Sequence, residues 1–209
     1  VGCHSFSRDQ GEEGYFLISA HILLVHGHIM PLTTRLLALR GEVPVSPLFR
    51  DILRTLLSQL KTGLEKLDTD DRMSVYENRD QIYLAALAQT DALYRAITLT
   101  LERHFLAHGA DPRPALQILQ LDRALCPRTG AERRLCESFD FDARAAFQAL
   151  AAMELPADSG RTAGCWTLEI DHPGGIGEIL HVADGGSWLR GVIRETDIDT
   201  SEVQFVALA

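Results

Sequence analysis

The feature that most constrains the fold is a run of mainly apolar residues near the start of the chain, Tyr15–Val25. A helix over this run would carry apolar side chains on almost every face, so we expect its neighbours to bury it on all sides. Ser7 and Gln10 precede the run with the spacing of a capping box. In that motif the side chain of each residue accepts a hydrogen bond from the backbone amide of the other. The sequence therefore predicts a central helix that begins after Ser7 and continues to about Met30.

Two further helical segments follow. Pro31 should end the first helix, because proline lacks the amide that the helix needs. Leu32–Arg40 is predicted as a helix that stops at Gly41, a residue type favoured just after a helix end. Ser46 and Pro47 have the pattern of a cap followed by the first helical residue. From there to about residue 67, the apolar residues fall within about 80° of arc, which predicts one face buried against the first helix: Phe49, Leu53, Leu56, Leu60, Leu64 and Leu67.

The middle of the chain is predicted to hold one long helix, from about Tyr76 to His108. Its apolar side is also confined to about 80° of arc and consists of Tyr83, Leu87, Thr90, Tyr94, Ile97, Leu101 and Phe105. Gly109 should close this helix, and Asp111 with Pro112 should open another. A short strand over Cys136–Phe141 and an alanine-rich helix over Asp142–Met153 are expected next.

The composition changes after Pro156, where short β-prone runs alternate with glycine-rich turns. The predicted strands are Trp166–Ile170, Gly177–Val182, Ser187–Ile193 and Val203–Leu208. We therefore predict a mainly α fold, a multi-helix domain followed by a small antiparallel β tail, which makes the chain α+β as a whole. The expected division is a helical domain over 1–125 and a mixed α/β tail over 126–209.

Composition limits the classes of partner. The 209 residues carry a formal net charge of −9 without a block of like charge, which disfavours a nucleic-acid partner. The four cysteines are far apart and suit a reducing cytoplasm better than a disulfide scaffold. The longest apolar run is shorter than the roughly 20 residues of a membrane span. We expect a cytoplasmic protein without a membrane span, and the Val1 start suggests a fragment whose N-terminal part is missing.

Three histidines, His21, His26 and His28, are the first candidates for a metal site. On a regular α-helix His21 and His28 share a face but lie about 10 Å apart along the axis, and His26 points elsewhere. Helical metal pairs use a spacing of four residues or similar, so that two nitrogens reach one ion. We therefore predict no metal ligands in the chain and interpret these histidines as core or pocket-lining residues.

Other polar patterns have simpler interpretations. Cys126 and Cys136 are not part of a Cys-x-x-Cys pair, so we expect buried, unligated thiols. Asp140 and Asp142 could act as an acid/base pair on one face of a strand, but Asp142 is more typical of a helix cap. The glycine-rich segment at 172–177 lacks the spacing of a dinucleotide-binding loop and is predicted to be a turn. The sequence contains no nucleophile elbow, phosphate-binding loop or metalloprotease motif.

Two stretches carry a resemblance to a known family. The first runs from "SFSRDQ" through "YFLISAHILLVHGHIMPLTTRLLAL" to "PVSPLFRDIL", and the second is "LQLDRALCPR…LCESFDFDARAAF". They resemble the helical region that follows the catalytic barrel in cobalamin-binding radical SAM enzymes, whose members carry a Ser-Arg-Glu-Asp-like start, an aromatic-rich helix with a histidine and a late Phe-Asp-Tyr-Asp-like strand. Together they cover about two-thirds of the chain, in loose patterns of residue type.

The resemblance implies the C-terminal accessory and substrate-pocket region of an enzyme for radical methyl transfer or cyclisation. The chain lacks the Cys-x-x-x-Cys-x-x-Cys and Asp-x-His-x-x-Gly motifs of that family. The [4Fe–4S] cluster, S-adenosylmethionine and cobalamin would then be bound by the missing N-terminal part, and this chain would supply no catalytic, cofactor-binding or metal residue.

The expected partners are the upstream barrel of the same polypeptide and a small-molecule or peptide substrate. The residues expected to face the substrate pocket are Arg8, Tyr15, His21 and His26. A different class stays open beside this interpretation, namely a self-contained, non-catalytic helical protein-interaction domain. Whether the chain belongs to an enzyme is therefore not decided by the sequence.

Overall fold

The computed structural model describes residues 7–60, 63–64, 67–126, 134–157, 166–171 and 203–207. The chain forms two compact units, and each unit draws on two separate segments of the sequence. Unit 1 consists of Val1–Gly27 with Val43–Ala110, and unit 2 of His28–Glu42 with Asp111–Ala209. The predicted mainly helical class is confirmed. The predicted boundary between residues 125 and 126 stays a prediction.

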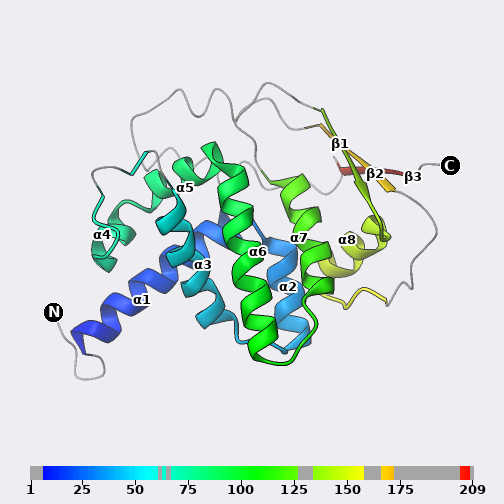
Figure 1. Ribbon diagram of the computed structural model, residues 1–209. Coiled ribbons are helices and arrows are strands. Elements are labelled where there is room, and N and C mark those ends of the chain that lie inside the picture. The colour runs from blue at the N-terminus through cyan, green and yellow to red at the C-terminus, as the bar shows by residue number, and fades with distance from the viewer. Residues whose placement is uncertain are drawn as a thin grey trace. The chain divides into compact units, whose positions relative to one another are not determined.

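Unit 1 is built from helices. It contains α1 (Arg8–His21), a π-helical turn η1 (Ile22–His26), α3 (Val45–Gln59), α4 (Arg72–Glu77), α5 (Arg79–Ala88) and α6 (Thr90–Ala107). Helices α3 and α6 lie side by side, and α1 packs on α3 and α4 (Figure 1). The apolar residues that become fully buried are mainly on α3 and α6: Leu48, Ile52, Leu53, Leu56, Leu93, Ile97 and Leu101.

The predicted apolar face of α3 is buried, but the helix is shorter than predicted. Leu53 and Leu56 are almost fully buried, and Leu60 and Leu64 are also buried. The helix itself ends at Gln59, because Leu60 has an extended backbone with ψ 113°. The predicted continuation to Leu67 is therefore wrong. The helix also begins at Val45, before the expected cap at Ser46.

The prediction of one long helix between residues 76 and 108 is also wrong. The segment is divided into α4, α5 and α6 by Asn78 and Gln89, both with non-helical backbone angles. The amide group of Asn78 donates to the Ser74 carbonyl at 2.8 Å, and that of Gln89 donates to the Ala85 carbonyl at 3.2 Å. These side chains satisfy carbonyls at the helix ends, so each break is stabilised locally.

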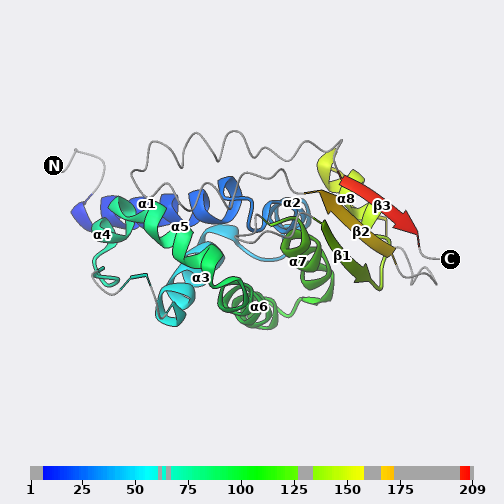
Figure 2. The same ribbon diagram turned by 90° about the horizontal axis from the view of Figure 1, so that it is seen from above.

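In its described residues, unit 2 combines α2 (Pro31–Arg40), α7 (Arg113–Leu125) and α8 (Ala143–Ala151) with three short strands. The strands are β1 (Arg134–Phe139), β2 (Trp166–Asp171) and β3 (Val203–Ala207), and they form an antiparallel sheet with β2 in the middle (Figure 2). Helix α2 packs on α7 and α8. The strands predicted over 177–182 and 187–193, and the turn at 172–177, lie outside the described residues.

Several helix ends match the sequence pattern. Pro31 is the first residue of α2, and Gly41 ends it with φ 65°. Gly109 follows α6 with the same φ, which a residue with a side chain rarely adopts. The Asp142 carboxylate accepts from the Ala145 amide at 2.9 Å and caps α8. Its predicted role as a helix cap is confirmed.

A residue from α7 caps the N-terminus of α2. Sequence analysis did not predict this cap. The fully buried Asp122 carboxylate accepts from the amide of Leu32 at 3.0 Å and from that of Thr33 at 2.7 Å. Such first-turn amides have no partner within their own helix, and they lie at the positive end of its dipole. Burial raises the pKa of Asp122 to about 7, although the two amides favour its ionised form.

The packing of α3 can be tested by truncating one side chain. Leu56→Ala should lower the free energy of unfolding by about 2–5 kcal/mol, because it leaves a cavity in the core of unit 1. Leu106→Ala is the matched control, since Leu106 is 81% exposed, and it should change this energy by less than about 0.5 kcal/mol. Urea denaturation followed by circular dichroism measures both. Equal effects of the two substitutions would contradict the assigned core.

The buried cap can be tested through its pH dependence. An unfolded aspartate has a pKa near 3.9, so between about pH 4 and pH 7 only the folded chain keeps a proton on Asp122. This contribution to the free energy of unfolding is present at low pH and should fall as the pH rises to about 7.

Asp122→Asn should abolish that pH-dependent contribution. It should also cost about 1–3 kcal/mol, because one of the two amides loses its acceptor. Denaturation curves of both proteins between pH 4 and pH 8 give the comparison. A constant difference between the two proteins across this range would rule out the proposed titration.

Candidate functional site

The four residues predicted to face a pocket all lie on α1 or on its π-helical continuation, and all four are exposed. Arg8 is in the first turn of α1 and pairs with Glu12 at 2.7 Å. The ring of Tyr15 packs at a tilt against that of Tyr76 on α4, with 4.8 Å between the ring centres. His21 ends α1, and His26 ends η1. Whether these residues face a pocket stays a prediction.

Helix α1 begins as the sequence predicts. The Ser7 hydroxyl accepts from the Gln10 amide at 3.2 Å, and the Gln10 side chain accepts from the Ser7 amide at 2.9 Å. These two bonds complete the predicted capping box. The start of the helix is therefore fixed by local side-chain contacts.

The expectation that α1 is buried on all sides is wrong. One side is buried, with Phe16, Ala20, Leu23 and Leu24 in the core of unit 1. On another side Tyr15 is 41% exposed and Ile18 is 47% exposed. The helix therefore presents an uncovered aromatic and aliphatic surface, which we call the α1 face and define by Tyr15, Ile18, His21 and His26.

The helix changes its geometry after His21. Over Ile22–His26 the backbone is π-helical, and the Gly27 amide donates to the Ile22 carbonyl, five residues earlier, at 2.8 Å. This wider turn accommodates one more residue than an α-helical turn. As a result the rings of His21 and His26 meet edge to face, with 5.1 Å between their centres. The expectation that His26 points away from His21 is wrong, because it assumed a regular α-helix.

Gly27 follows η1 at a position where the packing leaves no room for a side chain. A Cβ atom at this position would collide with the Leu23 carbonyl oxygen and would lie 2.6 Å from Cε2 of Tyr83. The Tyr83 hydroxyl, from α5, also donates to the Gly27 carbonyl at 3.1 Å. The aromatic ring therefore lies directly against the backbone at the end of η1, where only glycine fits.

His21 lies between an apolar ring, that of Phe49, and a polar one, that of His26. The ring of Phe49, on α3, lies 6.1 Å from it between ring centres. Partial burial lowers the pKa of His21, and the nearby charge of His26 lowers it further. The neutral imidazole is thus favoured at His21, and a neutral ring can act as a proton acceptor or metal ligand.

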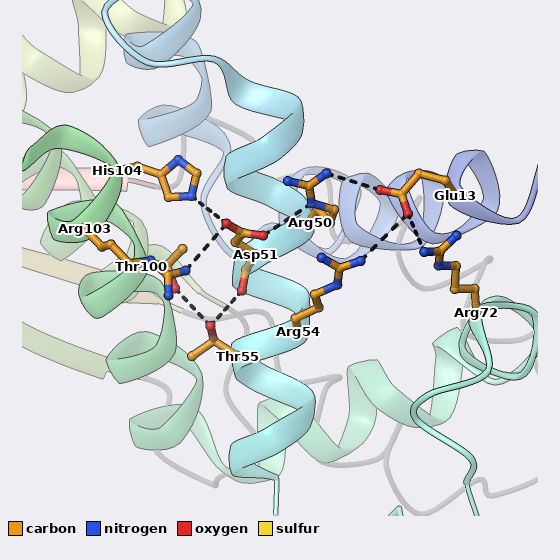
Figure 3. A network of polar contacts seen from close by, with 9 residues as sticks. All are labelled: Glu13, Arg50, Asp51, Arg54, Thr55, Arg72, Thr100, Arg103 and His104. Carbon is orange, nitrogen blue, oxygen red and sulfur yellow. Dashed lines mark hydrogen bonds and ion pairs between the residues drawn. The ribbon is translucent and has the colours of Figure 1, made fainter. Parts of the chain in front are cut away.

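A second group of polar residues joins four helices of unit 1 (Figure 3). Glu13 on α1 lies within 3.5–3.9 Å of three guanidinium groups, those of Arg50, Arg54 and Arg72. Asp51 on α3 accepts from His104 on α6 at 2.9 Å and lies 3.6 Å from Arg103. Sequence analysis missed this network, because its partners come from distant positions and follow no motif.

The network is best explained as structural. Burial alone would raise the pKa of Asp51, but the hydrogen bonds from His104 and Arg50 outweigh it and hold the pKa below its usual range. Asp51 and His104 have the residue types and the hydrogen bond of an acid/base pair. A hydroxyl for such a pair to act on would have to contact it. The neighbouring Thr100 hydroxyl instead donates to the Ala96 carbonyl at 2.8 Å and contacts Thr55.

The remaining candidates contribute no site among the described residues. Cys126 is buried, as predicted, and Asp140 is exposed. The side chain of Cys136 and the residues at 172–177 are not described. The described part of the chain contains no group of three or more His, Cys, Asp or Glu residues that could hold a metal ion.

Comparison with protein-family models, with curated proteins and with solved structures found no match to this chain. Within the described residues, no single helix has the length and apolar character needed to cross a membrane; only Arg8–His26 and Pro31–Arg40 taken together reach that length and composition.

The role of Gly27 can be tested by adding one methyl group. Gly27→Ala should lower the free energy of unfolding by about 1–3 kcal/mol, because the new Cβ would collide with Leu23 and Tyr83. Gly14→Ala is the matched control within α1, where a Cβ would meet open space, and it should instead stabilise the chain by about 0.5–1 kcal/mol. Thermal unfolding of the two variants measures the difference, and a neutral Gly27→Ala would contradict the close contact with Tyr83.

Proposed function

We propose that this chain is the C-terminal accessory and substrate-pocket region of a cobalamin-dependent radical SAM enzyme. In this proposal the helical body covers the mouth of an upstream barrel of the same cytoplasmic polypeptide, and a small antiparallel β tail ends the region. The barrel part would bind the [4Fe–4S] cluster, S-adenosylmethionine and cobalamin. The reaction class would be radical methyl transfer or cyclisation of a small-molecule or peptide substrate.

The observation that carries the proposal is the exposed α1 face. Helix α1 lies within the stretch that resembles these enzymes, and the run Tyr15–Val25, which covers its second half and most of η1, is apolar enough to predict burial on all sides. Unit 1 nevertheless leaves Tyr15 41% exposed and Ile18 47% exposed. Contiguous apolar surface rimmed by polar residues is typical of a face that contacts a ligand or another protein part.

The chemistry of the α1 face suits a substrate pocket. Such pockets combine apolar walls with a few polar groups that orient the ligand. Tyr15 and Ile18 provide apolar surface, while His21 and His26 provide hydrogen-bonding groups at its far end. Arg8, paired with Glu12 at 2.7 Å, lies at the start of the same helix. A cover of this kind would also exclude water from a reactive radical.

The same face supports a second function of a different class. In a self-contained helical interaction domain, the α1 face would bind another protein, and no cofactor would be involved. The upstream reading frame distinguishes the two functions. A Cys-x-x-x-Cys-x-x-Cys triad encoded in frame before Val1 supports the enzyme, whereas a start codon and promoter directly upstream support the interaction domain.

The proposal predicts how residues 1–209 behave when expressed alone. Without the barrel, the α1 face should bind a fluorescent hydrophobic dye and promote self-association. The double substitution of Tyr15→Ser and Ile18→Ser should reduce both, because it removes the exposed apolar surface. Leu106→Ser is the matched control, since it removes an exposed leucine from α6, away from this face. A dye-silent monomer would contradict the role as a cover of a barrel.

A further inference from the structure

The π-helical turn brings together two histidines whose spacing in the sequence would place them on different sides of an α-helix. His21 and His26 are five residues apart, which would separate them by well over a quarter turn on an α-helix. With η1 between them their rings are neighbours, with centres 5.1 Å apart and planes inclined by 76°. The geometric reason for excluding a metal site at these residues therefore no longer applies.

The ring separation matches that of two imidazoles bound to one ion. A zinc–nitrogen bond of about 2.1 Å, with about 1.1 Å from the nitrogen to the ring centre, places each ring centre ~3.2 Å from the ion. Two such rings at a tetrahedral angle have centres ~5.2 Å apart. The 5.1 Å between His21 and His26 is compatible with this value and also lies in the usual range of an edge-to-face ring contact.

Both rings are also accessible. His21 and His26 are exposed, and the hydrogen bonds among the described residues engage neither ring. Phe49 bounds the pair on one side, next to His21.

We propose that His21 and His26 form a two-histidine binding site for a divalent transition-metal ion of the zinc or nickel type. Imidazole nitrogen is a preferred ligand of both ions. The two side chains would supply two positions of the coordination sphere, and water would complete it. The site does not depend on the proposed function, because it rests only on the geometry of η1.

The chain contains a second histidine pair that serves as a comparison. His104 and His108 have the usual helical spacing of four residues, yet their rings are stacked with centres 6.4 Å apart. Nε2 of His104 faces Asp51 at 2.9 Å, and Nδ1 of His108 contacts the His104 carbonyl at 2.8 Å. These nitrogens already have partners, so this pair is not expected to chelate.

The experiment is a calorimetric titration of the metal-free protein with Zn²⁺, repeated with Ni²⁺, on four proteins. The unaltered chain and His108→Gln should each bind one ion per chain. His21→Gln and His26→Gln should each weaken this binding by about 100-fold, because a single imidazole loses the advantage of two linked ligands. Thermal unfolding without metal confirms that all four proteins are folded.

Thermal unfolding with metal gives an independent readout. Excess Zn²⁺ should raise the unfolding temperature of the unaltered chain and of His108→Gln, since the ion binds the folded state, and it should have little effect on the other two variants. Absence of saturable binding to the unaltered chain would overturn the proposal. Binding that keeps its affinity in both His21→Gln and His26→Gln would also overturn it, because the ion would then be held elsewhere.

Discussion

The contact between Gly27 and Tyr83 is the constraint that fixes the backbone at the end of η1. The tyrosine ring occupies the space where any other residue would carry its Cβ atom, and its hydroxyl binds the same peptide group. Directly before this contact, the helix widens into η1. The widening changes which side chains share a face, and so it decides that His21 and His26 become neighbours. A single packing contact from α5 thus accompanies the arrangement of the two histidines that we propose as metal ligands.

Charged residues support the same unit in a different way. Glu13 and Asp51 link α1, α3, α4 and α6 through arginines and a histidine (Figure 3). Individual exposed ion pairs contribute little to stability, but a network of several charges fixes the relative orientation of helices more effectively. The position of α1 is therefore set by apolar contacts on its buried side and by Glu13 near its start. Its remaining side is left available for contact with other molecules.

Sequence analysis predicted the features that depend on neighbouring residues. The capping box at Ser7 and Gln10, the cap at Asp142 and the buried face around Leu56 all follow from short-range spacing. The breaks at Asn78 and Gln89 were missed, because their side chains compete for backbone carbonyls and the apolar periodicity continues across them. Apolar periodicity indicates which face is buried, but it does not indicate where the helix ends.

The site could be predicted only in part for a related reason. The residue types on α1 drew attention to His21 and His26, but their separation was calculated for a regular helix. Nothing in the local sequence indicates the wider turn, which coincides with a ring contributed from 56 positions further along the chain. The residue that accepts hydrogen bonds from the α2 amides could not be predicted either, because Asp122 lies 90 residues from Leu32. Features that depend on such distant partners require the folded structure.

The interleaved order of the two units has a consequence for how the chain folds. The segment His28–Glu42 belongs with Asp111–Ala209, so the whole of Val43–Ala110 lies in the loop between them. Bringing the ends of a long loop together costs conformational entropy before any contact compensates for it. If Val43–Ala110 first compacts around α3 and α6, the effective loop becomes shorter, and the encounter of α2 with α7 becomes easier. Folding in that order would make unit 1 the early product and the Asp122 cap one of the last contacts to form.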